Sequence, residues 1–243
     1  IHIKNFNLLQ IDHCFRDDLS IHVNPIFDGL AAALGSLSKD DQDLGVMFID
    51  VGADKTNMLL YKDNYLIHSK VIPIGSKSVT KDIAAYLQTS IKRAESIKHE
   101  HVSALSDFAD PESNFELPIE NDDLTKSINQ KEISEIAELR YEDIIDQIKS
   151  EMKLLRMNIS DIRSGIKITG GGSNVRNLDL LFKKHFEDTK CEYLSINNTV
   201  FKENLEDRRE LSTLIGLLSW PIFNTEDSLS LIHISEPTRR YSI

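Results

Sequence analysis

One strand-turn-strand segment constrains the fold of this chain more than any other feature of the sequence. An apolar run, Gly45–Ile49, ends at Asp50, and a turn that contains Gly52 leads into a second strand-like run, Met58–Tyr61. Two such runs separated by a short turn pair as an antiparallel hairpin. An acidic residue at the tip of a buried strand can position a hydrated Mg²⁺ ion. The segment therefore predicts a sheet that begins with a hairpin and carries a metal-linked carboxylate at its end.

A second turn, far downstream, has the composition of a phosphate-binding loop. Ile166–Thr169 has the pattern of a strand, Gly170–Gly172 and Ser173 follow it, and a helical pattern begins at Asn177. Glycines in a strand-to-helix turn let backbone N–H groups approach an anion closely. Each turn alone is a weak signal, because Asp is common in ordinary turns and glycines also serve helix packing. Together the two turns predict one nucleotide site.

Composition restricts the class of protein. The chain has 243 residues, of which 40% are hydrophobic, so it can bury two modest cores. Its net charge is −11 and the basic residues are dispersed among acids, which argues against nucleic acid as a partner. With only Cys14 and Cys191, we expect neither a disulfide framework nor a zinc site, and a reducing cytosol is the natural compartment. No stretch approaches the length of a membrane span.

The order of the expected elements departs from a doubly wound sheet. The hairpin continues into a third strand at Tyr65–Ile72, and the sheet resumes only at Ile166, with a last strand at Cys191–Ile196. The remaining expected elements are a strand at 1–3, a helix at 5–19, a strand at 21–27, helices at 29–34, from 76 to 91 and around 93–99, an edge strand at 115–119, and helices at 131–158, 177–187 and 205–218. This order suits an α/β fold of the actin-like (ribonuclease H-like) type, in which a small α+β subdomain is inserted into a nucleotide-binding lobe.

We divide the chain on this basis. Residues 1–38 are expected to hold the end of a first lobe and an inter-lobe helix, and a polar break follows them. The nucleotide-binding core of the second lobe comprises 39–75 and 160–223, and residues 76–159 form the inserted subdomain. Because the chain begins with Ile1 rather than Met, we expect a fragment of a longer protein.

The last residues are expected to have a different origin. Within a tail that spans 224–243, residues 229–239 match the conceptual translation of a transposase sequencing adapter, and residues 240–243 have the length expected for a frame that continues into the next adapter bases. Pro237 also prevents an amphipathic helix there. We expect this segment not to be encoded by the organism, and resequencing of the locus would show whether the reading frame continues through it.

Several segments, from about 21 to 221, resemble the cell division protein FtsA, an actin-family member. His68–Pro73 followed by Val79–Ala84 is similar to the "HTKVIP…VTSDIA" segment of that family. Ala94–Lys98 is similar to its AExIK helix, and Ile168–Gly172 to its adenosine turn. Further similar segments are 27–31, 43–46 and 213–218. Together these matches are specific to the FtsA family.

The resemblance implies an ATP-binding protein that links the FtsZ ring to the inner membrane, on its cytoplasmic face at the division septum. It implies ATP and Mg²⁺ as cofactors, self-association into filaments and contacts with other divisome proteins. Missing parts of the protein would carry the first phosphate loop and an extra subdomain at the N-terminal side, and a membrane-targeting helix at the C-terminal side. Nucleotide would then shift the population of closed lobes rather than turn over rapidly.

The resemblance also assigns roles to particular residues. Asp50 would be the catalytic carboxylate and would position Mg²⁺. The other expected nucleotide contacts are Gly52, Lys55, Thr56, Asn57, Glu95, Lys98, Gly170, Gly171, Gly172 and Ser173. Arg140 and Asp143 match an Arg-X-X-acid helix that helps bind the C-terminal tail of FtsZ. Without the resemblance, Glu95 with Lys98 and Arg140 with Asp143 would be solvated ion pairs one helical turn apart.

One departure from the family pattern falls on the phosphate hairpin. The family has Asp-Ile-Gly-Gly-Gly-Thr-Thr-Asp, whereas residues 50–57 here are Asp-Val-Gly-Ala-Asp-Lys-Thr-Asn. Ala53 and Asp54 carry side chains where the backbone would approach phosphate. Asp54 also adds a negative charge that repels phosphate unless a metal or Lys55 compensates it. We therefore expect, at most, a slow ATPase.

Two other classes of protein share the expected fold. A sugar or acetate kinase would transfer phosphoryl with the help of a substrate-site acid in the first lobe. A binding module similar to PilM or DnaK would use the same fold without that chemistry. The sequence upstream of this chain would separate them. His99 and His101 are a weak metal signal, because no third ligand lies near them in the sequence.

Overall fold

The computed structural model describes most of the chain. It covers residue 10 and residues 13–15, 25–118, 125–187, 189–194, 196 and 208–223, without the side chains of 221–223. The strand predicted at 1–3, most of the helix at 5–19 and the tail at 224–243 lie outside the described residues. Residues 25–27, the described part of the strand predicted at 21–27, are not in a strand.

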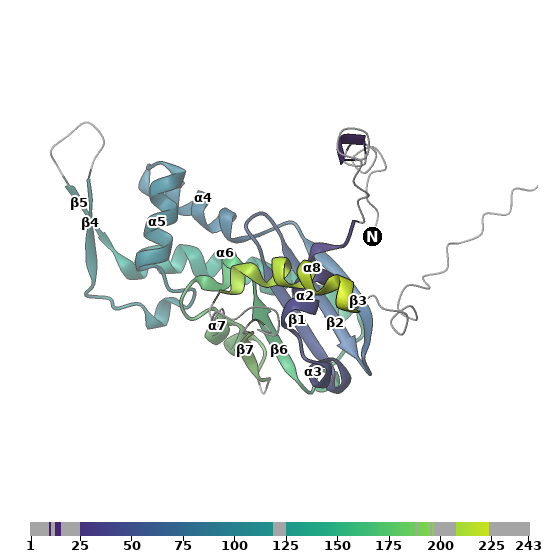
Figure 1. Ribbon diagram of the computed structural model, residues 1–243. Helices are drawn as coiled ribbons and strands as arrows, with labels where there is room; N and C mark the ends of the chain where they lie inside the picture. The colour runs from purple at the N-terminus through teal and green to yellow at the C-terminus, as the bar shows by residue number, and fades with distance from the viewer. Residues whose placement is uncertain are drawn as a thin grey trace, which may run out of the picture.

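A five-stranded sheet with the order β3-β2-β1-β6-β7 forms the centre of the molecule (Figure 1). The strand β2 (Thr56–Lys62) lies between β1 (Val46–Val51) and β3 (Tyr65–Ile72) and is antiparallel to both. The strands β6 (Gly165–Thr169) and β7 (Cys191–Tyr193) run parallel to β1. The predicted hairpin is therefore present as β1 and β2, and the strand predicted before the glycine turn is present as β6. The last strand ends at Tyr193, three residues before the predicted Ile196.

Helices cover both faces of this sheet and form part of the inserted segment. They are α2 (Asp28–Ser36), α3 (Lys39–Leu44), α4 (Ser76–Leu87), α5 (Ile91–His101), α6 (Gln130–Leu155), α7 (Leu178–His185) and α8 (Ser212–Phe223). Figure 1 shows α2 and α8 side by side on one face, and these two helices are in close contact. The helices α6 and α7 contribute to the core on the opposite face.

Strand β1 separates two hydrophobic cores. Met47, Ile49 and Val51 point into the core that α4, α6 and α7 share, whereas Val46 and Phe48 point into the core beneath α2. This division follows from the alternation of side chains along a strand. Asp50 is on the same face of the sheet as Phe48. Its carboxylate therefore lies on the α2 side, near the C-terminal end of β1.

The inserted segment contains a second, two-stranded sheet. The strand β4 (Asn114–Pro118) pairs with β5 (Thr125–Asn129), and both lie between α5 and α6 in the sequence. The prediction of a strand at 115–119 is confirmed for its described residues. Short 3-10 turns complete the fold: η1 (Ser106–Phe108), η2 (Ile159–Asp161), η3 (Gly171–Asn174) and η4 (Arg209–Leu211).

Several predicted boundaries were wrong. The polar break after residue 38 is the helix α3, which begins because the Ser38 hydroxyl accepts a hydrogen bond from the Asp41 N–H. Ile91 does not extend α4, because Gln88 ends that helix in a left-handed conformation, and it begins α5 instead. Arg156 ends α6 in the same way, before the predicted Asn158. Of the last helix, predicted from about residue 205, residues 205–207 lie outside the described residues. The described helix α8 begins at Ser212.

Candidate functional site

Three polar side chains lie in one row across the centre of the sheet. Asp50 on β1 is opposite Asn57 on β2 and opposite Thr169 on β6. All three side chains are buried, and Asn57 Nδ2 donates a hydrogen bond to Asp50 Oδ2 over 3.0 Å. The structure therefore brings the predicted Asp50 and Asn57 together. It adds Thr169, which sequence analysis had placed only in the strand.

Two oxygen atoms of this row have no hydrogen-bond partner among the described residues. They are Asn57 Oδ1 and Thr169 Oγ1, and both are buried. Buried polar atoms in folded proteins are nearly always satisfied by a partner, ordered water or an ion. Carboxylate, amide and hydroxyl oxygens are the ligands that Mg²⁺ and its bound waters prefer. The row is thus suited to a hydrated cation.

The ionisation of Asp50 is perturbed by its position. Burial raises the pKa of the Asp50 carboxyl above its ordinary value, and the nearby Asp28 raises this pKa further. The hydrogen bond from Asn57 and the charge of Lys55 act in the opposite direction. A bound cation would favour the ionised carboxylate at this position.

The turn between β1 and β2 contains backbone N–H groups that are available to a ligand. The Gly52 N–H donates to Lys55 O, and Gly52 O and Ala53 O accept from the N–H groups of Ser76 and Lys77 at the start of α4. Within the described part of the chain, the N–H groups of Ala53, Asp54 and Lys55 have no hydrogen-bond acceptor. Consecutive free N–H groups in a turn form a concave site for an anion.

The charges on this turn are arranged differently from the expectation. Asp54 is balanced by Lys77, whose Nζ lies 3.3 Å from Asp54 Oδ1. Lys55 does not have that role, because its Nζ lies 2.8 Å from Asp28 Oδ2, at the start of α2. The side chains of Ala53 and Asp54 are exposed. The hydroxyl of Thr56, another predicted contact, instead donates to Ile74 O over 2.8 Å.

The glycine turn packs directly on the end of β1. Gly170 has φ +88°, and a Cβ atom there would lie 2.3 Å from Asp50 Oδ1. At Gly172 a Cβ atom would lie 2.7 Å from Val51 Cγ1, so these two glycines are required by close packing. The Ser173 hydroxyl donates to Gly170 O over 2.7 Å and so closes the turn. Both predicted turns therefore meet at one edge of the sheet.

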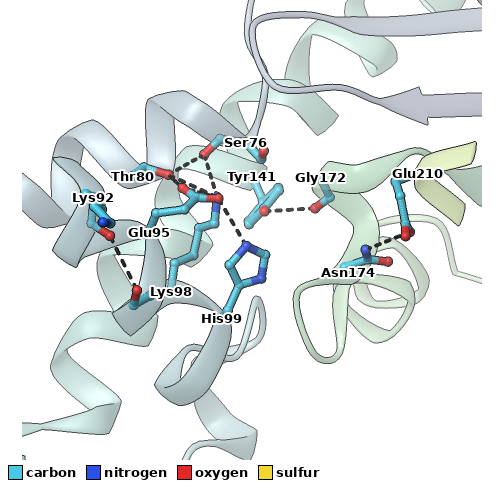
Figure 2. A network of polar contacts seen from close by, with 11 residues as sticks. Ser76, Thr80, Lys92, Glu95, Lys98, His99, Tyr141, Gly172, Asn174 and Glu210 are labelled. Carbon is cyan, nitrogen blue, oxygen red and sulfur yellow. Dashed lines mark hydrogen bonds and ion pairs between the residues drawn. The ribbon is translucent and has the colours of Figure 1, made fainter. Parts of the chain in front are cut away.

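Glu95 and Lys98 belong to a hydrogen-bond network in which Lys98 is buried and Glu95 is partly exposed, rather than to the solvated pair that their spacing alone would suggest. Lys98 is only 4% exposed, and its Nζ lies 2.8 Å from Glu95 Oε1 and 2.9 Å from Thr80 Oγ1. The Thr80 hydroxyl also donates to Glu95. Burial opposes ionisation of Glu95, but the hydrogen bonds from Lys98 and Thr80 outweigh it and lower its pKa. Figure 2 shows this network, with Glu95 facing His99.

Tyr141 connects the network region to the glycine turn. Its buried hydroxyl donates to Gly172 O over 3.2 Å, and Figure 2 shows it between the Glu95–Lys98 pair and Gly172. Sequence analysis missed Tyr141 and Thr80 as parts of the site. The spacing of Ala137, Tyr141 and Ile144 on one face of α6 was a signal that Tyr141 is buried.

Arg140 and Asp143 lie away from these turns, on the inserted segment. Arg140 Nε lies 2.7 Å from Asp82 Oδ2, and a terminal guanidinium nitrogen lies 2.8 Å from Asp143 Oδ2. They line a groove of about 470 Å³. Its lining residues are Asp82, Ile136, Leu139, Arg140, Glu142, Asp143 and Asp146. The predicted pair is therefore part of a three-residue network in a mainly acidic groove.

Neither a cluster of metal ligands nor a helix able to span a membrane is present among the described residues. No group of three or more His, Cys, Asp or Glu residues there is placed to hold a metal ion. This finding is compatible with Mg²⁺ at Asp50, because this ion is often held by one or two carboxylates together with phosphates. Among the same residues, no helix has the length and apolar character that crossing a membrane requires.

Sequence comparison gives a consistent family match. The family model "Cell division protein FtsA" matches residues 47–216. The FtsA of Bacillus subtilis (strain 168) is 34% identical over 142 residues, which are 58% of this chain and 32% of that protein. The FtsA of Escherichia coli (strain K12) is 27% identical over 201 residues, which are 80% of this chain and 48% of that protein. The chain spans about a third to a half of the length of these relatives.

Structural comparison identifies an actin-like fold. The crystal structure of MreB5 of Spiroplasma citri bound to ADP has a TM-score of 0.71 and 19% identity, and the match covers 94% of this chain and 68% of MreB5. The MamK double helical filament has a TM-score of 0.64 and 16% identity, and the match covers 91% of this chain and 66% of MamK. The predicted fold class is confirmed.

Proposed function

This chain belongs to the FtsA family of cell division proteins, and from that premise we propose that it forms one wall of a site for ATP and Mg²⁺. The observation that carries the proposal is the meeting of the two turns around Asp50 at one edge of the sheet. The MreB5 structures, which share the fold, contain ADP or AMPPNP. The domain division from the sequence, with residues 1–38 leading into this lobe, remains part of the proposal.

Each turn has a role in the proposed site. The free N–H groups of residues 53–55 and the ammonium of Lys55 would bind phosphate, and Asp50 with Asn57 and Thr169 would hold the hydrated Mg²⁺. The turn Gly170–Gly172 would face adenosine. The ion when bound would neutralise phosphate charge, and the residues of the row would fix its waters.

The exposure of each side chain decides which residues can contact the nucleoside. Lys98 is almost completely buried and engaged, so we assign it the positioning of Glu95 rather than a direct contact. Glu95, with its side chain 42% exposed, can reach a ligand. Gly52, Thr56 and Ser173 shape the turns through their hydrogen bonds.

We propose slow turnover and a structural role for the nucleotide. The exposed carboxylate of Asp54 disfavours extra negative charge near the turn, although Lys77 partly balances it. Binding would instead favour lobe closure and filament formation, in keeping with the filament-forming MamK of the same fold. The family match does not favour a kinase or a PilM-like or DnaK-like binding module.

The cellular role follows from the family. We propose that the protein acts at the cytoplasmic face of the inner membrane, where it links the FtsZ ring to the membrane together with other divisome proteins. Nucleic acid is not a proposed partner, because the chain has a net charge of −11.

Replacing Asp50 with asparagine should stabilise the free protein and weaken its nucleotide binding. Burial raises the folded-state pKa of Asp50, so the stability that this group contributes is greatest at low pH and is lost as the pH rises from the unfolded to the folded pKa. At pH 7, Asp50→Asn should therefore raise the melting temperature by about 2–4 °C, a shift that corresponds to roughly 1 kcal/mol in a chain of this size. Calorimetry should show a loss of affinity for Mg·ATP of roughly tenfold or more, because the metal-linked charge is gone.

The two measurements on Asp50→Asn test different statements. The asparagine oxygen can still accept the hydrogen bond from Asn57, so the fold is retained. Unchanged affinity for Mg·ATP would contradict the role of Asp50 in binding. A lower melting temperature would contradict the claim that burial of the charge is costly.

Arg140→Glu should weaken binding of the FtsZ C-terminal tail by roughly tenfold, if the proposed role of Arg140 and Asp143 is right. The change reverses a charge beside Asp82 and Asp143. Stability should fall only slightly, because the replaced ion pairs are partly exposed. Fluorescence anisotropy with a labelled tail peptide measures the affinity.

Arg93→Glu is a matched control for this prediction. Arg93 lines a different groove, together with His101 and Phe115, and carries the same charge. It should leave tail binding unchanged. Equal losses from the two variants would show that net charge, rather than the Arg140 groove, governs the affinity.

A further inference from the structure

The ammonium of Lys55 is held by the first residue of α2. Its Nζ lies 2.8 Å from Asp28 Oδ2 and 3.0 Å from Asp28 Oδ1. The two side chains are 43% and 40% exposed, so a ligand from solvent can reach both. Lys55 is also the last residue of the turn whose N–H groups are free, at the point where a phosphate would bind.

We propose that Asp28 competes with the phosphates of a nucleotide for Lys55. In the free protein the lysine is bound to Asp28, and in the nucleotide complex the same lysine is bound to phosphate. This inference rests on the proposed nucleotide site and adds to it a residue that opposes binding. Asp28 is not among the contacts that the sequence predicts.

The relative strengths of the two interactions support the exchange. A half-exposed ion pair contributes little to stability, so its loss is a small cost. A polyphosphate has several negative charges and can accept all three ammonium hydrogens. Asp28 is left in the first turn of α2, where the helix dipole stabilises a negative charge without Lys55.

Asp28, rather than Asp54, is the carboxylate that competes for Lys55. Asp54, the other carboxylate on the turn, is bound to Lys77 rather than to Lys55. The start of α2 is also packed on the polar row, because a Cβ atom at Gly29 would lie 2.9 Å from Asn57 Cβ. Release of Asp28 therefore connects phosphate binding to the position of α2.

The experiment is a double-mutant cycle on the 243-residue chain. The proteins are wild type, Asp28→Asn, Lys55→Met and the double variant, and calorimetry measures their affinities for Mg·ATP and for inorganic tripolyphosphate. Asp28→Asn should tighten binding about three- to tenfold, the range expected for one exposed charge pair. Lys55→Met should weaken binding and remove most of the effect of Asp28→Asn, because the competitor acts mainly through this lysine.

Asp54→Asn is the matched control, since it also removes one negative charge near the turn. Its effect on binding should be the same with and without Lys55. A second readout is the amide NMR signal of Gly29, which should shift on addition of Mg·ATP in wild type and not in Lys55→Met.

The outcomes separate this inference from the proposed function. If wild type binds Mg·ATP but Asp28→Asn does not bind it more tightly, or does so equally in the Lys55→Met background, the competition is refuted and the nucleotide site stands. If no protein of the set binds Mg·ATP or tripolyphosphate, the proposed site and the competition are both wrong.

Discussion

Gly216→Ala should cost about 3–5 kcal/mol of folding stability, because it forces two helix backbones apart. A Cβ atom at this position of α8 would lie 1.6 Å from Ala31 O and 2.5 Å from the Ala31 carbonyl carbon on α2. Backbone atoms cannot rotate out of the way, in contrast to the end of a flexible side chain. The gain of about 1 kcal/mol in helix propensity on replacing Gly by Ala is too small to offset this overlap.

Urea denaturation followed by circular dichroism measures this effect. Leu217→Ala is the control, because Leu217 is the neighbouring residue on α8 and is 44% exposed. It should change stability by at most about 0.5 kcal/mol. Equal stabilities of the two variants would show that α2 and α8 are not in backbone contact.

Gly170→Ala should weaken nucleotide binding and destabilise the second turn. Gly170 has a positive φ that alanine disfavours, and the added Cβ atom would lie 2.3 Å from Asp50 Oδ1 and 2.5 Å from Val51 O. To accommodate it, the carboxylate or the turn must move. We expect a loss of about 2–4 kcal/mol in stability and at least about a tenfold loss of affinity for Mg·ATP.

Gly171→Ala is the control within the same turn. Its Cβ atom would lie 3.3 Å from Glu210 Cβ, and it has an ordinary φ, so the side chain can be accommodated. Its stability should stay within about 1 kcal/mol of wild type. If both variants bind Mg·ATP as wild type does, the glycine turn is not part of the site.

The sequence predicted the parts of the fold that have local signals. The hairpin β1–β2, the strand β3 and the return at β6 follow from short apolar runs bounded by turns. The strand β5 was missed, because Thr125–Asn129 is mostly polar and only Ile128 of it is buried. The helix α3 was missed although Ser38 is a good N-cap, because its six residues have no buried face.

The contacts that shape the site could not be predicted locally. The pair Lys55–Asp28 joins residues 27 positions apart, and burial of Lys98 depends on α4 packing against α5. Sequence alone therefore left a metal or Lys55 as the compensation for Asp54, and without the family resemblance it favoured a surface pair for Glu95 and Lys98. Conversely, the residue types of the two turns indicated one shared site, and the structure places Gly170 directly beside Asp50.

Amide NMR spectra of the 243-residue chain during titration with Mg·ATP test the central claim most directly. We expect shifts at the N–H signals of residues 53–55 and 170–172, little change around the groove of Arg93 and Phe115, and loss of the shifts in Asp50→Asn. Shifts confined to other residues, or shifts of equal size in wild type and Asp50→Asn, would contradict it.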